Sequence, residues 1–339
     1  MRILPSKKRV WKRTLLSFLI SLLLLYLFLS KANLGEILRS MSGFDPFFIL
    51  LAFLSHYTSY LLRGYRWKRM IQSPGFSGTS FDLAKTIFLF QSLNCVLPAK
   101  LGDLYGAHLM GINFSLSRSY ALGSLFLWRV FDFVMVVTMA MTTAFLLFGD
   151  RVPSEFFWAM EVVGSCLLLL LVFLWLFFHY HKRFPWVNRP GRLKGLVDSF
   201  REGLRMRWRD VPFLFVTTAM IWCLEAGRFY FVCKSTSIDI RAIPALFITS
   251  SAAFLTIIPF TPSGLGAVEL SMLKLLDYLG IGNQMAYPLI IGDRIIAHWS
   301  QVLLGILLLL FSGTIKLKLW EFQEEKGGGQ GKSPPDAHP

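Results

Sequence analysis

A chain of 339 residues that is 54% hydrophobic and only 16% charged is too apolar for an ordinary soluble domain, and its composition indicates a polytopic membrane protein. A formal charge of +15 suits a nucleic-acid-binding protein only if the basic residues line one water-exposed face. Here they form short clusters between apolar runs, so no nucleic-acid partner is expected. The four cysteines lie in or at the edge of apolar runs without ligand spacing, which predicts neither a disulfide framework nor a metal site.

Six apolar runs are each long enough to cross a hydrocarbon layer about 30 Å thick. The first follows residues 1–13, which carry six Lys or Arg and no acid and predict a basic cytoplasmic N-terminus. A cleaved signal peptide is the alternative, but no A-x-A-like site follows, so a membrane span is favoured. The six runs are residues 14–30, 46–62, 120–148, 158–178, 211–232 and 286–311.

Two further apolar regions are interrupted by prolines and glycines. Residues 83–97 and 104–116 flank the sequence PAKLGD, and residues 243–258 and 267–281 flank PFTPSGLG. At about 1.5 Å per residue, pieces of this length reach only about 20 to 24 Å. They predict two re-entrant helical hairpins, although two thin crossings each would also fit. The predicted hairpin tips contain Pro98, Gly102, Pro262, Gly264 and Gly266.

Basic clusters predict the orientation of the chain. By the positive-inside rule they lie in the cytoplasm together with both termini, so the first hairpin opens from the cytoplasm and the second from outside. The clusters are Arg63, Arg66, Lys68 and Arg69, then nine Lys or Arg in residues 182–209, then Lys316 with Lys318.

The basic loop of residues 179–210 has a pattern of its own. Apolar side chains recur every four residues at Leu196, Phe200, Leu204 and Trp208, with basic residues around them. This pattern predicts an amphipathic helix on an anionic leaflet, with a solvated basic loop as the alternative. Residues 319–339 are rich in Gly, Pro and charge and predict a disordered C-terminal tail.

Three landmarks recur in one order at nearly one offset, which predicts an internal duplication. Residues 14–151 would form the first membrane repeat and residues 152–318 the second. Because the copies cross the membrane in opposite directions, the predicted fold is an all-α polytopic membrane protein with an inverted-topology repeat, six full transmembrane helices and two re-entrant hairpins. Such repeats are typical of transporters. The landmark pairs, separated by 163 to 165 residues, are Gly64 with Gly227, Pro98 with Pro262, and Arg129 with Arg294.

Charged residues within or beside the apolar runs are the candidate binding residues. A charge near the bilayer centre costs about 2.5 to 3.5 kcal/mol on insertion scales, so each needs a partner or a function. Arg129 and Asp132 lie three apart on one helical face, which fits a structural ion pair or coordination of a phosphate. Hairpin tips that present helix N-termini would favour an anion, with tight packing of the turns as the alternative. The candidates are Lys100, Asp103, Arg129, Asp132, Glu225, Arg228, Glu269, Asp293 and Arg294.

Four segments resemble the transmembrane, flippase-like region of the lysylphosphatidylglycerol synthases and its stand-alone bacterial and archaeal relatives. The resemblance extends over most of the chain, and it implies a multi-pass protein of the cell (inner) membrane. In the full-length synthases this region is thought to move aminoacylated phospholipid between leaflets, while a cytosolic domain makes that lipid. We expect no aminoacyl-transfer domain in these 339 residues, so lysylphosphatidylglycerol itself is not the favoured cargo. The segments are LLRGYRW (61–67), NCVLPAKLGDLYGA (94–107), WRVFD (128–132) and IPFTPSGLGAVE (258–269).

The favoured function is therefore a lipid flippase or transporter for an anionic or modified lipid of the phospholipid or polyprenyl-phosphate type. A membrane enzyme or subunit of lipid-linked glycan or terpenoid-lipid synthesis, with Asp103 or Glu269 as acid or base, is the alternative. A scaffold for a separately encoded lipid-modifying enzyme is a third hypothesis. No P-loop, nucleophile elbow or dinucleotide fingerprint occurs, so neither catalysis nor a cofactor is expected. His56 and His298 show no ligand spacing and are expected to pack.

Overall fold

The structure is a computed structural model that describes residues 7–30, 32–97, 100–149, 191–236, 238, 240–257 and 262–311, with scattered positions between 157 and 176. Every regular element in these residues is helical, as predicted. The elements are α1 (Lys7–Leu29), α2 (Leu34–Ser42), α3 (Pro46–Met70), α4 (Ser80–Val96), α5 (Leu101–Phe114), α6 (Arg118–Phe148), α9 (Arg192–Gly203), η4 (Trp208–Asp210), α10 (Val211–Ser235), α11 (Ala242–Ile257), η5 (Pro262–Gly264), α12 (Ala267–Tyr278), α13 (Asn283–Arg294), the π-helix η6 (Ile295–Trp299) and α14 (Ser300–Phe311).

Helix starts follow local capping chemistry. Asp45 accepts a hydrogen bond from the Phe47 N–H group and Pro46 occupies the first turn, so α3 begins at once after the turn. Thr79 and Asp82 form a reciprocal capping box at the start of α4. These caps fix where α3 and α4 begin.

Three helical stretches in the described part of the chain are long and apolar enough to cross a membrane: Arg118–Phe148, Trp208–Ser235 and Asn283–Phe311. A fourth candidate is the pair Phe18–Leu29 and Leu34–Ser42, which is bent by 79°. α3 contains the predicted run 46–62 but continues through four basic residues, and is less apolar. The predicted run 158–178 lies largely outside the described residues, so six full spans stay a prediction.

The two interrupted regions form pairs of short helices. α4 contacts α5 and α11 contacts α12, and the four helices have 17, 14, 16 and 12 residues. Each is about 18 to 26 Å long at 1.5 Å per residue, which is short for a bilayer. The prediction of short paired helices is confirmed, although their re-entrant path through a membrane stays a prediction.

The hairpin tips differ from their prediction in one detail. Gly102 lies in the first turn of α5, where an added Cβ would be 2.1 Å from the Phe90 carbonyl oxygen, so this glycine lets α5 pack on α4. Pro262 lies in η5 between the two arms, and the second arm, α12, begins only at Ala267. Gly264 and Gly266 have φ angles of +74° and +86°, and these left-handed positions make the turn possible. Pro98 lies outside the described residues.

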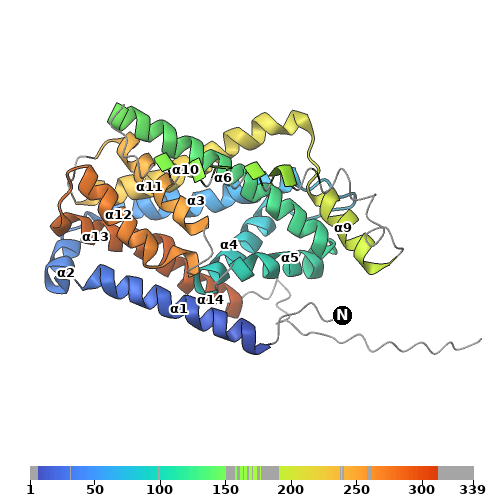
Figure 1. Cartoon of the computed structure of the whole chain (residues 1–339), viewed down its shortest axis with the longest axis horizontal. Coiled ribbons are helices and arrows are strands. Elements are labelled where there is room, and N and C mark those ends of the chain that lie inside the picture. The colour runs from blue at the N-terminus through green and yellow to red at the C-terminus, as the bar shows by residue number, and fades with distance from the viewer. Residues whose placement is uncertain are drawn as a thin grey trace, which may run out of the picture.

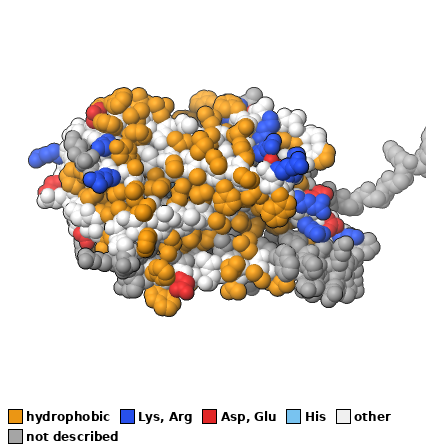
Figure 2. All heavy atoms as spheres, turned by 90° about the horizontal axis from the view of Figure 1, so that it is seen from above, with side chains coloured by type: hydrophobic (Ala, Val, Ile, Leu, Met, Phe, Trp, Pro, Cys, Tyr) orange, Lys and Arg blue, Asp and Glu red, His pale blue; other side chains and the backbone are white. Residues whose placement is uncertain are grey.

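The helices surround a charged interior and expose an apolar exterior. α1 and α6 lie on opposite sides of the molecule, while α2 and α9 lie toward opposite ends of its long axis (Figure 1). Figure 2 shows mainly hydrophobic side chains across the middle of one face, with most charged side chains toward the two ends. This distribution is the reverse of a soluble protein's surface and suits a surround of lipid.

The predicted amphipathic helix of the basic loop is partly wrong. α9 ends at Gly203, so Leu204 and Trp208 lie beyond it, and the four apolar residues do not share one helix. α9 crosses α6 very closely, because an added Cβ on Gly203 would be 2.1 Å from the Tyr120 carbonyl oxygen. The loop is thereby attached to the helix that carries Arg129 and Asp132.

This crossing gives a stability prediction. Gly203→Ala should lower the midpoint of thermal unfolding in detergent by several degrees, since overpacking a close contact costs about 1 to 3 kcal/mol. Gly195→Ala on the same helix is the matched control, because an added Cβ there has nothing within 4 Å. The control should be neutral or slightly stabilising, as Ala favours helix over Gly. Equal midpoints for the two variants would contradict the close α6–α9 contact.

Candidate functional site

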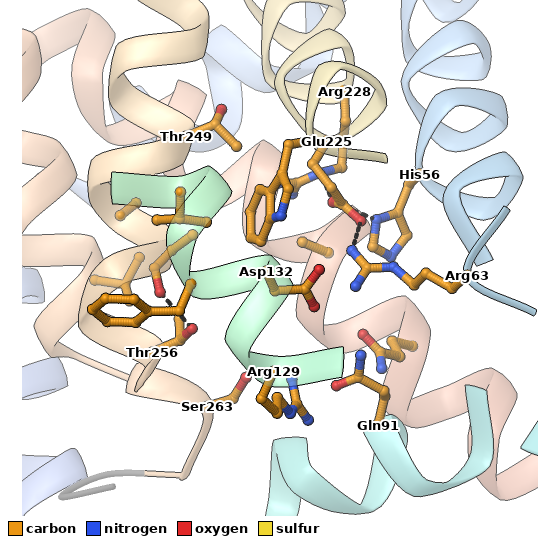
Figure 3. Close-up of a pocket in the computed structure, with 18 of the residues that line it drawn as sticks. His56, Arg63, Gln91, Arg129, Asp132, Glu225, Arg228, Thr249, Thr256 and Ser263 are labelled. Carbon is orange, nitrogen blue, oxygen red and sulfur yellow. Dashed lines mark hydrogen bonds and ion pairs between the residues drawn. The ribbon is translucent and has the colours of Figure 1, made fainter. Parts of the chain in front are cut away.

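A cavity of about 350 Å³ lies between α3, α6, α10, α11, α13 and the two hairpin tips. Seven of the nine predicted binding residues line it, and the other two, Asp103 and Glu269, form ion pairs with residues that do. Figure 3 shows Glu225, His56 and Arg63 on one side, Asp132 between the helices, and Arg129 near Gln91 and Ser263. The seven are Lys100, Arg129, Asp132, Glu225, Arg228, Asp293 and Arg294.

Glu225 on α10 is bound by three side chains of α3. Arg63 Nη2 donates to it over 2.9 Å, the Ser59 hydroxyl over 2.8 Å, and His56 Nδ1 lies 3.1 Å from its second oxygen. Glu225 as a whole residue is only 7% exposed. Charge-assisted hydrogen bonds of this kind offset the desolvation of a buried carboxylate, and here they also join α3 to α10.

Asp132 on α6 pairs with Arg66 of α3. Arg66 Nη1 lies 2.7 Å from the Asp132 carboxylate and 2.6 Å from the Thr218 hydroxyl, and Arg66 is 1% exposed. Its guanidinium also lies over the Trp128 ring, 5.3 Å from the centroid. Arg66 thus connects three helices at one buried point.

Each hairpin is held by an arginine of a later helix. Arg129 donates two hydrogen bonds from Nη2 to Asp103, at 2.8 and 3.1 Å, and Asn94 donates to the same carboxylate at 2.7 Å. Arg294 Nε lies 3.1 Å from Glu269, whose other oxygen accepts the Gly266 N–H at 2.6 Å. The acidic residue in the first turn of each second arm is therefore the anchor of that arm.

Arg228 lies between two acids. Its Nη1 is 2.7 Å from Asp293 and its Nε is 3.5 Å from Glu225. Glu225 and Arg228, three residues apart, therefore form an ion pair, but it is longer than the pair between Arg228 and Asp293. For Arg129 and Asp132 the same spacing does not mark a pair, since their closest ionic partners are Asp103 and Arg66; the structural-pair alternative is wrong here.

The sequence interpretation missed three residues of the site. Arg63 and Arg66 were assigned to a cytoplasmic cluster, but both are buried in ion pairs, which leaves Lys68 and Arg69 as its exposed members. His56 does more than pack, because it contacts Glu225. One signal was present: Arg63 and Arg66 lie three residues apart around Gly64, at the end of an apolar helix.

Several buried polar atoms at the cavity have no hydrogen-bond partner among the described residues. They include His56 Nε2, Arg63 Nε, Trp222 Nε1 and Thr249 Oγ1. The two non-glycine residues with left-handed backbone that line the cavity, Lys100 (φ 53°) and Ser263 (φ 49°), lie at its hairpin tips. Unpaired polar groups and strained backbone of this sort cluster at binding sites. Within the described residues, no three potential metal ligands converge.

An all-helical fold with an apolar exterior and buried charges defines a multi-pass integral membrane protein. The sequence matches the model of the lysylphosphatidylglycerol synthase TM region over residues 14–305, so the chain belongs to this family.

Archaeal relatives extend the match. A UPF0104 membrane protein of Methanocaldococcus jannaschii is 28% identical over 64% of this chain and 92% of its own length. Another, from Methanothermobacter thermautotrophicus, is 24% identical over 85% of this chain and 90% of its own length. The glycosyltransferase AglD of Haloferax volcanii is 25% identical over 40% of this chain but only 22% of that enzyme.

The Arg66–Asp132 pair gives a prediction about the stability of the site. Arg66→Met should lower the free energy of unfolding by about 3 to 5 kcal/mol, because it leaves a buried carboxylate without its ionic partner. Adding Asp132→Asn should restore part of that loss, since the unpaired charge is removed. Chemical unfolding in detergent micelles measures both effects.

Lys68→Met, two residues along the same helix and exposed, is the control and should change stability by less than about 0.5 kcal/mol. Additive losses for Arg66→Met and Asp132→Asn would show that the two side chains do not interact energetically.

Proposed function

We propose that the protein is a lipid transporter of the flippase type, which moves an anionic or modified lipid of the phospholipid or polyprenyl-phosphate kind between membrane leaflets. The observation that supports this best is the cavity, where buried basic side chains face apolar ones. Phe133 and Val136 of α6 and Ala252 and Ala253 of α11 form part of the apolar lining. A head group and the start of a hydrocarbon chain would find matching surroundings there.

The proposed mechanism depends on an inverted repeat. Ion pairs between corresponding helices of the two halves support it, although these residues do not occupy matching sequence positions: Arg66–Asp132 joins α3 to α6, and Arg228–Asp293 joins α10 to α13. In the same way each hairpin is bound by an arginine, as described above. Two halves related in this way can rock against each other and open a central site to either side of the membrane.

This mechanism predicts the sides of two loops. With native cysteines replaced, Ser115→Cys and Gly280→Cys should react with impermeant thiol reagents from opposite faces of the membrane. Both residues end the second arm of a hairpin with positive φ, 53° and 78°. Gly195→Cys on α9 is a reference for the cytoplasmic face and should label together with Ser115→Cys. Labelling of all three from one face would rule out the inverted arrangement.

Transport itself is tested by reconstitution. Proteoliposomes should exchange labelled lipids between leaflets faster than empty liposomes, and Arg129→Ala should slow the exchange at least about tenfold, since charge-assisted hydrogen bonds contribute about 1.5 to 3 kcal/mol. Arg118→Ala, exposed at the start of the same helix, is the matched control and should exchange at the unmodified rate. Exchange no faster than in empty liposomes across a broad lipid panel would refute the proposal.

A second candidate function is a membrane subunit or enzyme of lipid-linked glycan synthesis. The partial match to a glycosyltransferase favours it, although that match covers only part of either protein. Product formation by the purified protein from a lipid-linked sugar would support it. For either function, we propose a separately encoded lipid-modifying enzyme as the protein partner. It would contact the exposed basic side chains of α9 and of the loop that follows α9. The protein would lie in the cell membrane of a bacterium or archaeon, with both of its termini in the cytoplasm.

A further inference from the structure

The positive and negative charges of the residues at the cavity do not cancel. The term charged cluster is used for the charged residues that line the cavity and for the residues that form ion pairs with them. It contains six basic residues, which are Arg63, Arg66, Lys100, Arg129, Arg228 and Arg294, and five acidic residues, which are Asp103, Asp132, Glu225, Glu269 and Asp293. With His56 counted as neutral, one positive charge remains.

The ion pairs of the cluster show that the excess positive charge belongs to Lys100. Each of the five arginines has a carboxylate within ion-pair distance, whereas Lys100 has none among the residues that the structure describes. Lys100 precedes the first turn of α5, with φ of 53°, a conformation that non-glycine residues rarely adopt. The fold therefore holds a basic side chain at the cavity wall under local strain and without an acid.

The neighbourhood of Lys100 is also the most open part of the charged cluster. Its neighbour Arg129 keeps 26% of its side chain exposed, compared with 1% for Arg66 and 8% for Arg63 and Arg228. A ligand entering the cavity can thus reach Arg129 and Lys100 without breaking the deeper pairs. Thr249, only 7% exposed, adds a hydroxyl oxygen without a partner at the same cavity.

We propose that the cavity selects lipid head groups with one negative charge, as in a phosphodiester, and that Lys100 is the residue that contacts this charge. The inference rests on the proposed function and specifies its substrate class. A monoanion brings the charged cluster to neutrality, whereas a phosphomonoester dianion leaves a net negative charge and a zwitterionic head group a net positive one. Imbalance of this kind is penalised most where the dielectric constant is low.

The lipid, rather than a free phosphate, is the expected ligand because the cavity wall beside the charges is apolar. Phe133, Val136 and Ala253 line it, and they offer nothing to a water-soluble phosphodiester. A glycerophosphodiester without acyl chains has the same head group as the lipid. Comparing the binding of the two compounds therefore shows whether the acyl chains contribute to binding.

The test measures binding with purified full-length protein in nanodiscs at pH 7, where a phosphomonoester is mostly dianionic. Phosphatidylglycerol should bind about fivefold or more tightly than either phosphatidic acid or phosphatidylcholine, and water-soluble glycerophosphoglycerol should bind at least about tenfold more weakly than phosphatidylglycerol. Preference for phosphatidic acid, or equal binding of the lipids, would overturn the proposal; equal binding of the water-soluble compound would overturn its lipid part.

Variants assign the selectivity to Lys100. Lys100→Met should bring the ratio of phosphatidylglycerol to phosphatidylcholine affinities to about 1, Lys100→Arg should retain it, and the exposed control Lys68→Met should leave it unchanged. Retained selectivity in a folded Lys100→Met protein would remove Lys100 from the site. Charge-selective binding without leaflet exchange would refute the transport function and support this inference. Leaflet exchange without charge selectivity would support the transport function and refute this inference.

Discussion

Buried ionic hydrogen bonds are the constraint on which this structure depends. In a lipid bilayer, contact between apolar side chains of two helices gains little free energy, because the lipid tails around them are equally apolar. Helix association therefore relies on close packing and polar contacts. Glu225 illustrates this, since it receives hydrogen bonds from three side chains of α3 and is approached by Arg228 on its own helix. The other acids of the charged cluster likewise join different helices. Removing one charge therefore affects both the cavity and the packing around it.

Close backbone contacts complement these pairs. Gly64 faces the Ser80 carbonyl and Gly102 the Phe90 carbonyl, at distances that admit no Cβ. Such contacts keep α3, α4 and α5 near enough for short side chains such as Asn94 and Asp103 to meet. Between the charged cluster and α11, the cavity lining changes from arginine to alanine and threonine, so one space combines a polar end and an apolar wall. This combination is the basis for proposing a lipid, and not a small ion, as the ligand.

Much of this arrangement could be predicted from the sequence, because its signals are local. Apolar run length marked the short helices, and charges within or beside apolar runs marked seven residues of the cavity. The partners could not be predicted: Arg129 and Asp132 share a helical face, but their nearest opposite charges come from α5 and α3. The burial of Arg63 and Arg66 could not be predicted, because a basic residue at the end of an apolar helix gives the same sequence pattern whether it faces lipid phosphates or a buried acid. Similarly, Pro262 could have started a helix, but the left-handed glycines that follow it delay the start of α12 to Ala267.

The long sequence separation within the Glu225 site has a consequence for biosynthesis. Arg63 enters the membrane with α3, but its carboxylate is made 162 residues later. At about 5 to 20 residues per second, that interval is roughly 8 to 32 s. During this time the Arg63 charge lacks the carboxylate that it binds in the folded protein, and a long side chain toward the end of a helix can still reach a polar region. The ion pair that joins α3 to α10 can therefore form only after α10 has been made, so the Glu225 site cannot assemble from the first half of the chain alone.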